Sequence, residues 1–440
     1  MSLSQKVAFN TLVQIVSKAA TVVFGLLTTI FLTRYLGRDG YGDYMYIITL
    51  VVLFGAFADW GTCNIGVREA AKVKNNQGQA LANIILVRLI LTLGATLLLA
   101  LSAFLLPLQS SRPELVRQAV VLSSTLLFLF ATKASFGIVF QTKLAMQNLA
   151  AADIVGSVLT FIFTWFFIQN KLDLLPLIGA VILANAVALL IAWYLAKKLV
   201  KFDFHWDKPF AKNLVKESLP MGAILLMFTV DNKIDTVMLG SIKGSGAVGV
   251  YSVAYRIYDV LILGAAYLMN SLLPILSQYA DLTKFKEKLV LIYQKTFDIL
   301  LLMGVGVVTL VLVFTPIIVR IITQQRFVEF SDSIPVLRLL SIALFLAYFN
   351  HLTGYTIVAL GRQRTYFWVA ASALAFNVIA NLLVIPRFSY FGAAGVTAFT
   401  EGLVLIITTI FIFRMIKIIP SLTQFPNTVV QLIKQKGKIF

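Results

Sequence analysis

The sequence has few of the side chains that metal-binding and catalytic sites use most. It contains one cysteine and two histidines in 440 residues. Because Cys63 is alone, an intramolecular disulfide is excluded. So few soft ligands also argue against a dedicated zinc site. No G-x-x-x-x-G-K-[ST] sequence is present, so the chain lacks that phosphate-binding loop for ATP.

Charge is scarce as well, and negative charge is the scarcest. Only 13% of the residues are charged and 59% are hydrophobic, with 37 basic against 19 acidic residues. This composition excludes a soluble globular domain and indicates a polytopic membrane protein. The apolar runs are continuous, which predicts helices rather than the alternating strands of a barrel. The net charge of +18 is typical of the positive-inside bias, so nucleic acid is not an expected partner.

Twelve apolar runs approach the length of about 20 residues that a membrane-spanning helix needs. They fall near residues 9–33, 44–62, 81–106, 117–141, 149–169, 174–196, 214–241, 248–277, 293–322, 334–359, 366–386 and 392–414. The first run has only a short polar lead and no small-residue cleavage site after it. We therefore expect it to be a retained span rather than a signal peptide.

The loops between these runs predict how the chain is oriented in the membrane and how its spans group into two lobes. With both termini in the cytoplasm, the inside segments hold 22 basic residues and the outside segments 9. Residues 1–196 and 214–414 are expected to form two six-helix lobes around a central cleft. They are joined by a basic cytoplasmic linker, 197–213, and followed by a basic cytoplasmic tail, 415–440. The linker's lysines and aromatic residues suit a helix lying on the anionic leaflet, with a solvated linker as the alternative.

The two halves show a weak internal repeat. A shift of 207 residues carries Gly37 onto Gly244 and Tyr44 onto Tyr251. Glycines at these places predict tight turns between antiparallel helices. An even number of spans in each half gives both halves the same orientation, as in parallel repeats related by an axis along the membrane normal.

Basic residues inside the spans are the main functional signal. Lys18, Arg88, Lys133, Lys233 and Arg256 lie within apolar runs, where a charge costs about 2.5–3.5 kcal/mol and usually faces a bundle interior or a watery cavity. Several inward cations predict a path for an anionic substrate. For Lys18 and Lys133 the alternative is a helix-to-helix ion pair. Arg88 is close enough to the cytoplasmic end to predict that it snorkels to the interface.

Arg256 is the best candidate for phosphate contact, because its planar fork binds phosphate through two hydrogen bonds. Lys18, Lys133 and Lys233 would act as point charges. The acidic residues of the spans are candidates for ion pairs or for coupling to protons or sodium ions: Asp231, Asp235, Asp259, Asp298 and Glu401. No other cofactor and no metal are expected.

Other polar residues of the C-terminal half are candidates for contact with a polar, bulky substrate. They are Asn350, His351, Tyr355, Asn377 and Asn381. Polar residues in membrane helices also join neighbouring helices through hydrogen bonds, and for the asparagines this alternative is favoured.

Several segments resemble the polysaccharide transport family, the Wzx-type flippases of the superfamily that includes multidrug exporters and lipid II flippases. The motifs are LTRYLGRDGYGDY and ADWGTCNIGVREAAK, then DNKIDTVMLGS and GVYSVAYRIYD, and finally NHLTGYTIVALGRQRTYFW and NVIANLLVIPRFSYFGAAGVTAFTE. The resemblance implies an all-α, MATE-like fold of two six-helix bundles in the bacterial inner membrane. It also implies alternating-access export of an undecaprenyl-pyrophosphate-linked oligosaccharide, with the bilayer, a polysaccharide polymerase and the chain-length machinery as partners.

Three alternatives remain open at this point. A multidrug exporter of the same fold would favour an acidic and aromatic cleft, whereas lysines favour an anionic substrate. An exporter of lipid II or teichuronic acid would share the cationic path. A membrane-embedded glycosyl or acyl transferase is disfavoured, because the outside loops are short and hold no cluster of acids or histidines.

Overall fold

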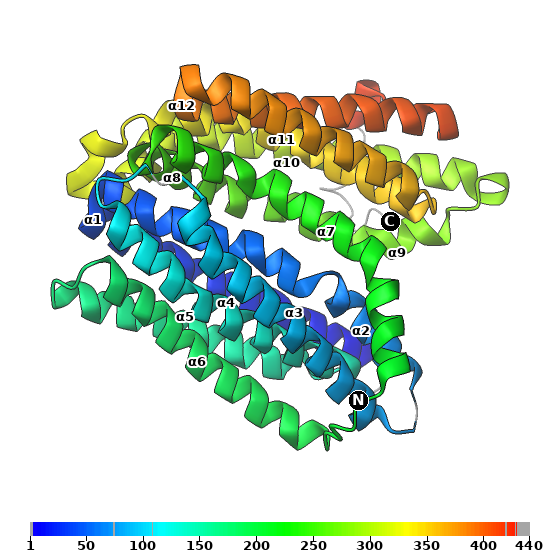
Figure 1. Ribbon diagram of the computed structural model, residues 1–440. Helices are drawn as coiled ribbons and strands as arrows, with labels where there is room; N and C mark the ends of the chain where they lie inside the picture. The colour runs from blue at the N-terminus through cyan, green and yellow to red at the C-terminus, as the bar shows by residue number, and fades with distance from the viewer. Residues whose placement is uncertain (1–2, 74, 108, 419, 427, 429–440) are drawn as a thin grey trace. The chain divides into compact units, whose positions relative to one another are not determined.

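The computed structural model describes residues 3–73, 75–107, 109–418, 420–426 and 428, and every regular element among them is helical (Figure 1). The α-helices are α1 (Leu3–Asp59), α2 (Thr62–Lys72), α3 (Gln77–Leu105), α4 (Pro113–Thr142), α5 (Met146–Gln169), α6 (Leu174–Leu199), α7 (Lys208–Lys243), α8 (Ser245–Leu261), α9 (Leu263–Gln278), α10 (Leu282–Thr323), α11 (Ser333–Ala359) and α12 (Gln363–Ile416). Two short 3₁₀ helices are η1 (Gln324–Phe330) and η2 (Leu422–Gln424).

Ten helical stretches of the described chain are long and apolar enough to cross a membrane, with α8 and α9 forming one of them. Three of the α-helices contain a residue with non-helical backbone angles, which are Gly37 in α1, Phe285 in α10 and Ser389 in α12. Gly37 and Ser389 divide α1 and α12 into two helices each, whereas Phe285 lies near the start of α10, before its apolar run. Figure 1 shows α12 turning back on itself between its orange and red halves. The divided helices correspond to the twelve predicted spans, and the all-helical fold class is confirmed.

The repeat-related glycines have matching backbone conformations. Gly37 has φ 68° and ψ −172°, and Gly244, between α7 and α8, has φ 84° and ψ 179°. A positive φ with an extended ψ is open to glycine and costly for other residues. The turns after Gly37 and Gly244 also meet, because a Cβ on Gly42 would collide with the Ser245 carbonyl. The prediction that these glycines make tight turns is confirmed.

The chain divides into two compact units. The first comprises residues 1–249 with 322–326, and the second comprises 250–321 with 327–440. The first unit therefore contains α7, which the sequence-based lobes assign to the C-terminal half. The division into two six-helix lobes remains a prediction.

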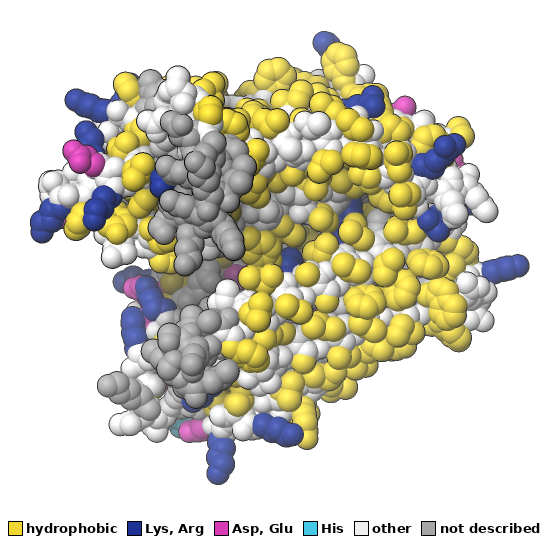
Figure 2. Space-filling model, turned by 180° about the vertical axis from the view of Figure 1, so that it is seen from behind, with side chains coloured by type: hydrophobic (Ala, Val, Ile, Leu, Met, Phe, Trp, Pro, Cys, Tyr) yellow, Lys and Arg dark blue, Asp and Glu magenta, His cyan; other side chains and the backbone are white. Residues whose placement is uncertain are grey.

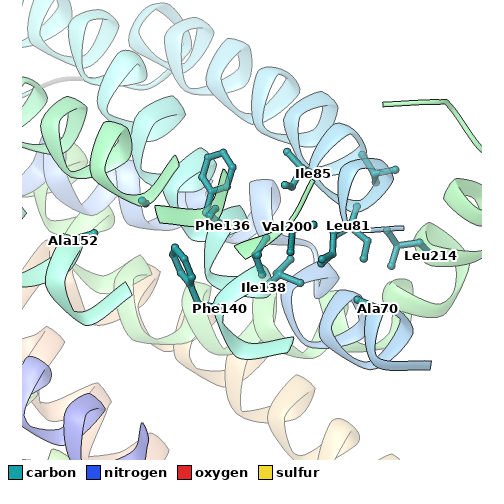
Figure 3. Packing of buried hydrophobic residues seen from close by; sticks show 14 of the residues in the cluster. Ala70, Leu81, Ile85, Phe136, Ile138, Phe140, Ala152, Val200 and Leu214 are labelled. Carbon is teal, nitrogen blue, oxygen red and sulfur yellow. The ribbon is translucent and has the colours of Figure 1, made fainter. Parts of the chain in front are cut away.

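A well-packed apolar core lies at one end of the first unit. Leu81 from α3, Phe136 and Ile138 from α4, Val200 after α6 and Leu214 from α7 belong to one buried cluster (Figure 3). Burial of these side chains fixes the end of α6 and the start of α7 against α3 and α4. The elements at this end are therefore held together by packing as well as by hydrogen bonds.

The prediction of a helix in the linker is wrong for its middle part, because residues 197–199 end α6 and residues 208–213 begin α7. Residues 200–207 are extended, and α7 begins at Lys208, where the Asp207 carboxylate accepts a hydrogen bond from the Phe210 N–H at 3.0 Å. This N-cap ends the extended segment and starts the helix. Most of the predicted tail, including Lys434, Lys436 and Lys438, lies outside the described residues.

The surface of the described chain has the pattern of a membrane protein. Figure 2 shows hydrophobic side chains covering much of one face, with lysine and arginine side chains gathered mainly towards its two sides. Exposed leucine, isoleucine, valine and phenylalanine side chains occur on most of the membrane-length helices. Such a surface is stable in hydrocarbon and would be costly in water.

Candidate functional site

Arg88 on α3 lies at the centre of a buried polar network, and its predicted snorkelling is wrong. Its side chain is 1% exposed. The guanidinium donates to Asp59 Oδ1 at 2.5 Å, to Thr62 Oγ1 at 2.7 Å and to Ser135 Oγ at 2.8 Å. These partners come from the end of α1, from α2 and from α4. Arg88 therefore neutralises Asp59 and ties four helices together rather than reaching the interface.

Lys133 on α4 forms an ion pair with a neighbouring helix. Its Nζ lies 2.8 Å from Asp153 Oδ1 of α5 and 5.5 Å from the ring centroid of Phe130. The lysine is buried, while the aspartate is one-third exposed. Of the two alternatives for Lys133, the structure shows the helix-to-helix ion pair.

Lys18 on α1 has a different environment. It is exposed, and among the described residues no acidic group lies within ion-pair distance of it. Thr11 and Gln14 are exposed on the same side of the helix, at the three- and four-residue spacings that share a face. Buried Asn10 and Ser17 lie on the adjacent face of the helix and donate to the Leu144 and Ala150 carbonyls. Because a polar, exposed stripe is costly in lipid, the face that carries Lys18 is suited to lining a watery path.

The predicted acidic cluster of α7 lies in the same unit as Lys18. Asp235 is buried, and its Oδ1 accepts a hydrogen bond from the Thr236 N–H at 2.6 Å. Asp231 and Lys233 are half-buried. The distinction between a structural ion-pair network and a functional role for these three residues remains a prediction.

Arg256 on α8 combines partial burial with an unsatisfied donor. Among the described residues, its buried Nε has no hydrogen-bond acceptor, and no carboxylate lies within ion-pair distance of the guanidinium. Asp259 is also half-buried, one turn further along α8. The rings of Tyr251, Tyr255 and Tyr258 contact one another in turn on this helix in tilted arrangements, with centroid separations of 5.3 and 5.2 Å. An unsatisfied guanidinium N–H is a donor available to an anionic ligand.

Glu401 on α12 bonds to α11. Asn350 Nδ2 donates to the Glu401 backbone oxygen at 2.8 Å and to its carboxylate at 2.6 Å. Asn350 is buried, and Glu401 is half-buried. For Asn350 the structure therefore shows a hydrogen bond between helices, which is the alternative favoured by the sequence.

His351 and Tyr355 occupy successive turns of α11. Their ring centroids are 6.1 Å apart, and Tyr355 donates to the Asn270 side-chain carbonyl of α9 at 2.7 Å. His351 and Tyr355 are half-buried, and Asn270 is exposed. Together they form a polar-aromatic patch on the second unit, the kind of surface on which sugar rings pack.

The remaining predicted residues lie in tightly bonded positions. Asn377 and Asn381 are buried on α12, and Asn381 Nδ2 donates to Asn377 Oδ1 at 2.7 Å. Asp298 on α10 is buried and accepts hydrogen bonds from Gln294 at 2.9 Å and from Thr428 at 2.6 Å. These contacts fix Asp298 to its own helix and to the C-terminal segment.

Sequence reasoning missed several contributors to these sites. The Thr11–Gln14–Lys18 stripe has a helical spacing that the sequence displays, so it could have been found. Ser135 and Asn270 carry no comparable signal, because single polar residues in apolar helices do not reveal their partners. No group of three or more His, Cys, Asp or Glu side chains in the described parts of the chain is placed to hold a metal ion.

Solved structures that match this fold include membrane transporters. The lipid II flippase MurJ in an inward closed conformation has a TM-score of 0.76 at 14% identity, covering 98% of this chain and 93% of that one. An inward-facing multidrug resistance MATE transporter has a TM-score of 0.73 at 16% identity, covering 90% and 94%. A Pyrococcus furiosus transporter, described as having a binding pocket of reverse polarity, has a TM-score of 0.63 at 17% identity, covering 94% and 95%.

Sequence comparison gives a family. The profile of the polysaccharide biosynthesis protein family matches residues 7–280, and the MatE profile matches residues 220–383. Two membrane proteins of Methanocaldococcus jannaschii, described as uncharacterized, are also similar. MJ1375 is 24% identical over 293 residues, covering 63% of this chain and 68% of the relative. MJ1068 is 23% identical over 267 residues, and the match covers 59% of this chain and about half, 52%, of that relative.

The class of protein follows from the fold and from these matches. The molecule has the fold of multi-pass membrane transporters of the multidrug/oligosaccharidyl-lipid/polysaccharide superfamily. By the family match over more than half of its length, the chain belongs to the polysaccharide biosynthesis protein family.

Proposed function

We propose that this transporter moves a polyprenyl-pyrophosphate-linked oligosaccharide, a repeat unit for a surface polysaccharide, from the cytoplasmic to the outer leaflet by alternating access. The observation that carries the proposal is a contrast among basic side chains within membrane-length helices. Arg88 and Lys133 are neutralised by aspartates. Lys18 and Arg256 have no acidic partner among the described residues.

Electrostatic cost supports this assignment. An unpaired charge at membrane depth lowers stability by a few kcal/mol on insertion scales. A pyrophosphate entering the same region loses hydration, and fixed cations offset that loss. Lysine supplies a point charge, while arginine supplies a planar fork that matches phosphate oxygens. The two side chains therefore suit an anionic group better than a cationic drug.

The glycan needs a different kind of surface. His351, Tyr355 and Asn270 present aromatic faces and amide groups on the second unit. Sugars bind such surfaces through stacking of their apolar faces and through hydrogen bonds to their hydroxyls. We assign contacts with the glycan to this patch, and contacts with the pyrophosphate separately to Lys18 on the first unit and to Arg256 on the second.

The family supports the substrate class. Polysaccharide assembly requires that lipid-linked precursors reach the far leaflet, and the matched family takes its description from polysaccharide biosynthesis. Export of lipid II or teichuronic acid would use the same cationic side chains. Cation-coupled drug export has support from the MatE match over residues 220–383 and from the acidic residues of α7. We place the protein in the bacterial cytoplasmic membrane with both termini inside, coupled to a proton or sodium gradient.

Charge removal at the two unpaired cations tests the proposal. The variants Lys18→Gln and Arg256→Gln are each reconstituted into vesicles and compared in flipping of a fluorescent undecaprenyl-pyrophosphate oligosaccharide. Lys286→Gln, a change at an exposed lysine near the start of α10, is the matched control. We expect at least a tenfold lower rate for the first two and no change for the control, with unfolding midpoints preserved. Equal rates in all four proteins would reject the assignment of the pyrophosphate.

A further inference from the structure

The end of α6 has the side chains of a membrane–water interface. Lys197 Nζ lies 4.2 Å from the ring centroid of Trp193, and Lys198 Nζ lies 4.3 Å from that of Tyr194. All four side chains are exposed. Tryptophan and tyrosine concentrate at the headgroup level of membrane helices, and lysines next to them extend into the phosphate layer. This end of α6 therefore lies where its helix leaves the hydrocarbon.

The extended segment that follows α6 is fixed to the protein by its backbone. Asn83 Nδ2 on α3 donates to the His205 carbonyl at 2.8 Å, and the Asp207 N–H donates to Asn83 Oδ1 at 2.8 Å. Val200 belongs to the buried cluster shown in Figure 3, and the Phe202 ring packs edge-on against Phe136 at 6.5 Å. Residues 200–207 are thus held in place without forming a helix.

Large apolar side chains point away from this fixed backbone. Phe204 is 60% exposed and Trp206 is 44% exposed, and Lys201 is exposed beside them. The two acidic residues of the segment are already occupied, because Asp203 accepts from the His205 N–H and Asp207 caps α7. Exposed aromatic residues interleaved with lysines bind a membrane surface through apolar insertion and electrostatic attraction together.

We propose that this surface binds the headgroups of anionic phospholipids in the adjacent leaflet. We call it the linker surface and define it by Lys197, Lys198, Lys201, Phe204 and Trp206. The lysines attract the lipid phosphates, while Phe204 and Trp206 enter the upper acyl region. A rigid backbone means that little conformational entropy is lost when the side chains engage lipid. The site anchors the segment between α6 and α7 to the bilayer and is independent of the transported substrate.

Fluorescence of Trp206 tests the proposal locally. The full chain is reconstituted into phosphatidylcholine vesicles containing a small fraction of a lipid brominated near its headgroup end. The lipid is either phosphatidylglycerol or phosphatidylcholine. The difference between wild type and Trp206→Phe isolates the quenching of this one indole. At low salt, we expect brominated phosphatidylglycerol to quench Trp206 at least fivefold more strongly than the same fraction of brominated phosphatidylcholine. This preference should shrink as salt screens the lysines.

A charge-matched pair of triple variants separates a specific site from general attraction. Lys197→Gln/Lys198→Gln/Lys201→Gln should abolish the preference for phosphatidylglycerol. Lys284→Gln/Lys286→Gln/Lys288→Gln removes the same charge from exposed positions of α10 and should preserve it. If both triple variants lose the preference for phosphatidylglycerol equally, the proposed lipid site is wrong. Equal quenching of the wild type by the two brominated lipids would also reject it. If the first variant fails to fold, the wild-type comparison and its salt dependence still decide the question.

Discussion

Replacing Arg88 by methionine is the sharpest test of the polar network in the first unit. Methionine fills much of the same space but leaves the Asp59 carboxylate without its cation. Thr62 and Ser135 keep partners of their own, since their hydroxyls also donate to the Asp59 and Ala131 carbonyls. Most of the cost therefore comes from Asp59, which is 27% exposed.

Removing one partner of a buried ion pair lowers the free energy of unfolding by about 3–5 kcal/mol. Because Asp59 is partly exposed, we expect a loss near the lower end of this range, about 3 kcal/mol. Adding Asp59→Asn removes the stranded charge and should recover about 1.5 kcal/mol. Unfolding in mixed detergent micelles measures both values. Lys72→Met is the control. It removes an exposed lysine from Glu69, which keeps its pair with Arg68, so the expected change is about 0.5 kcal/mol or less. A loss below about 1 kcal/mol for Arg88→Met would refute the reasoning.

Three further predictions use the same unfolding measurement. Gly42→Ala places a Cβ against the Ser245 carbonyl and should lower the free energy of unfolding by about 1–3 kcal/mol. Gly94 has open space around it, so Gly94→Ala should not destabilise the protein. Equal effects of the two changes would contradict the close approach at Gly42. Lys133→Met should lower stability, and adding Asp153→Asn should restore part of it. If the double variant is stable but does not flip the lipid-linked sugar, Lys133 has a role in transport besides its ion pair. Hydrogen bonds from Thr283 and the Lys284 N–H lower the pKa of Asp281, between α9 and α10, below its usual value. The stability from this carboxylate is therefore present above its unfolded pKa, near 4, and is lost as pH falls through the folded pKa. Asp281→Asn should lose less stability between about pH 5 and pH 2, and a profile identical to wild type would count against these hydrogen bonds to Asp281.

Much of the fold was accessible from sequence, because continuous apolar runs leave a chain in lipid few choices. The twelve spans follow from hydropathy, and the turn at Gly37 follows from its glycine and its repeat partner Gly244. The linker was the exception. Residues 200–207 are extended because Asn83 pairs with their backbone, and a single asparagine in an apolar helix gives no sign of such a partner.

The candidate site was less predictable. The sequence identified the charges within the spans, but it did not separate Lys133, which pairs with Asp153, from Lys18, which is exposed. Both lysines are flanked by apolar residues in the sequence. Their difference depends on which residue of a neighbouring helix faces them, and that is set by helix packing. Arg88 illustrates the same limit, because its partners come from three other elements.

Substrate choice by the intact protein tests the central claim most directly. Wild-type protein in sealed vesicles is given a fluorescent undecaprenyl-pyrophosphate oligosaccharide and, in parallel, a cationic dye under the same ion gradient. The proposed function predicts movement of the anionic lipid-linked sugar across the bilayer and no accumulation of the dye. Dye export without movement of the lipid-linked sugar would contradict it and would support the cation-coupled drug exporter.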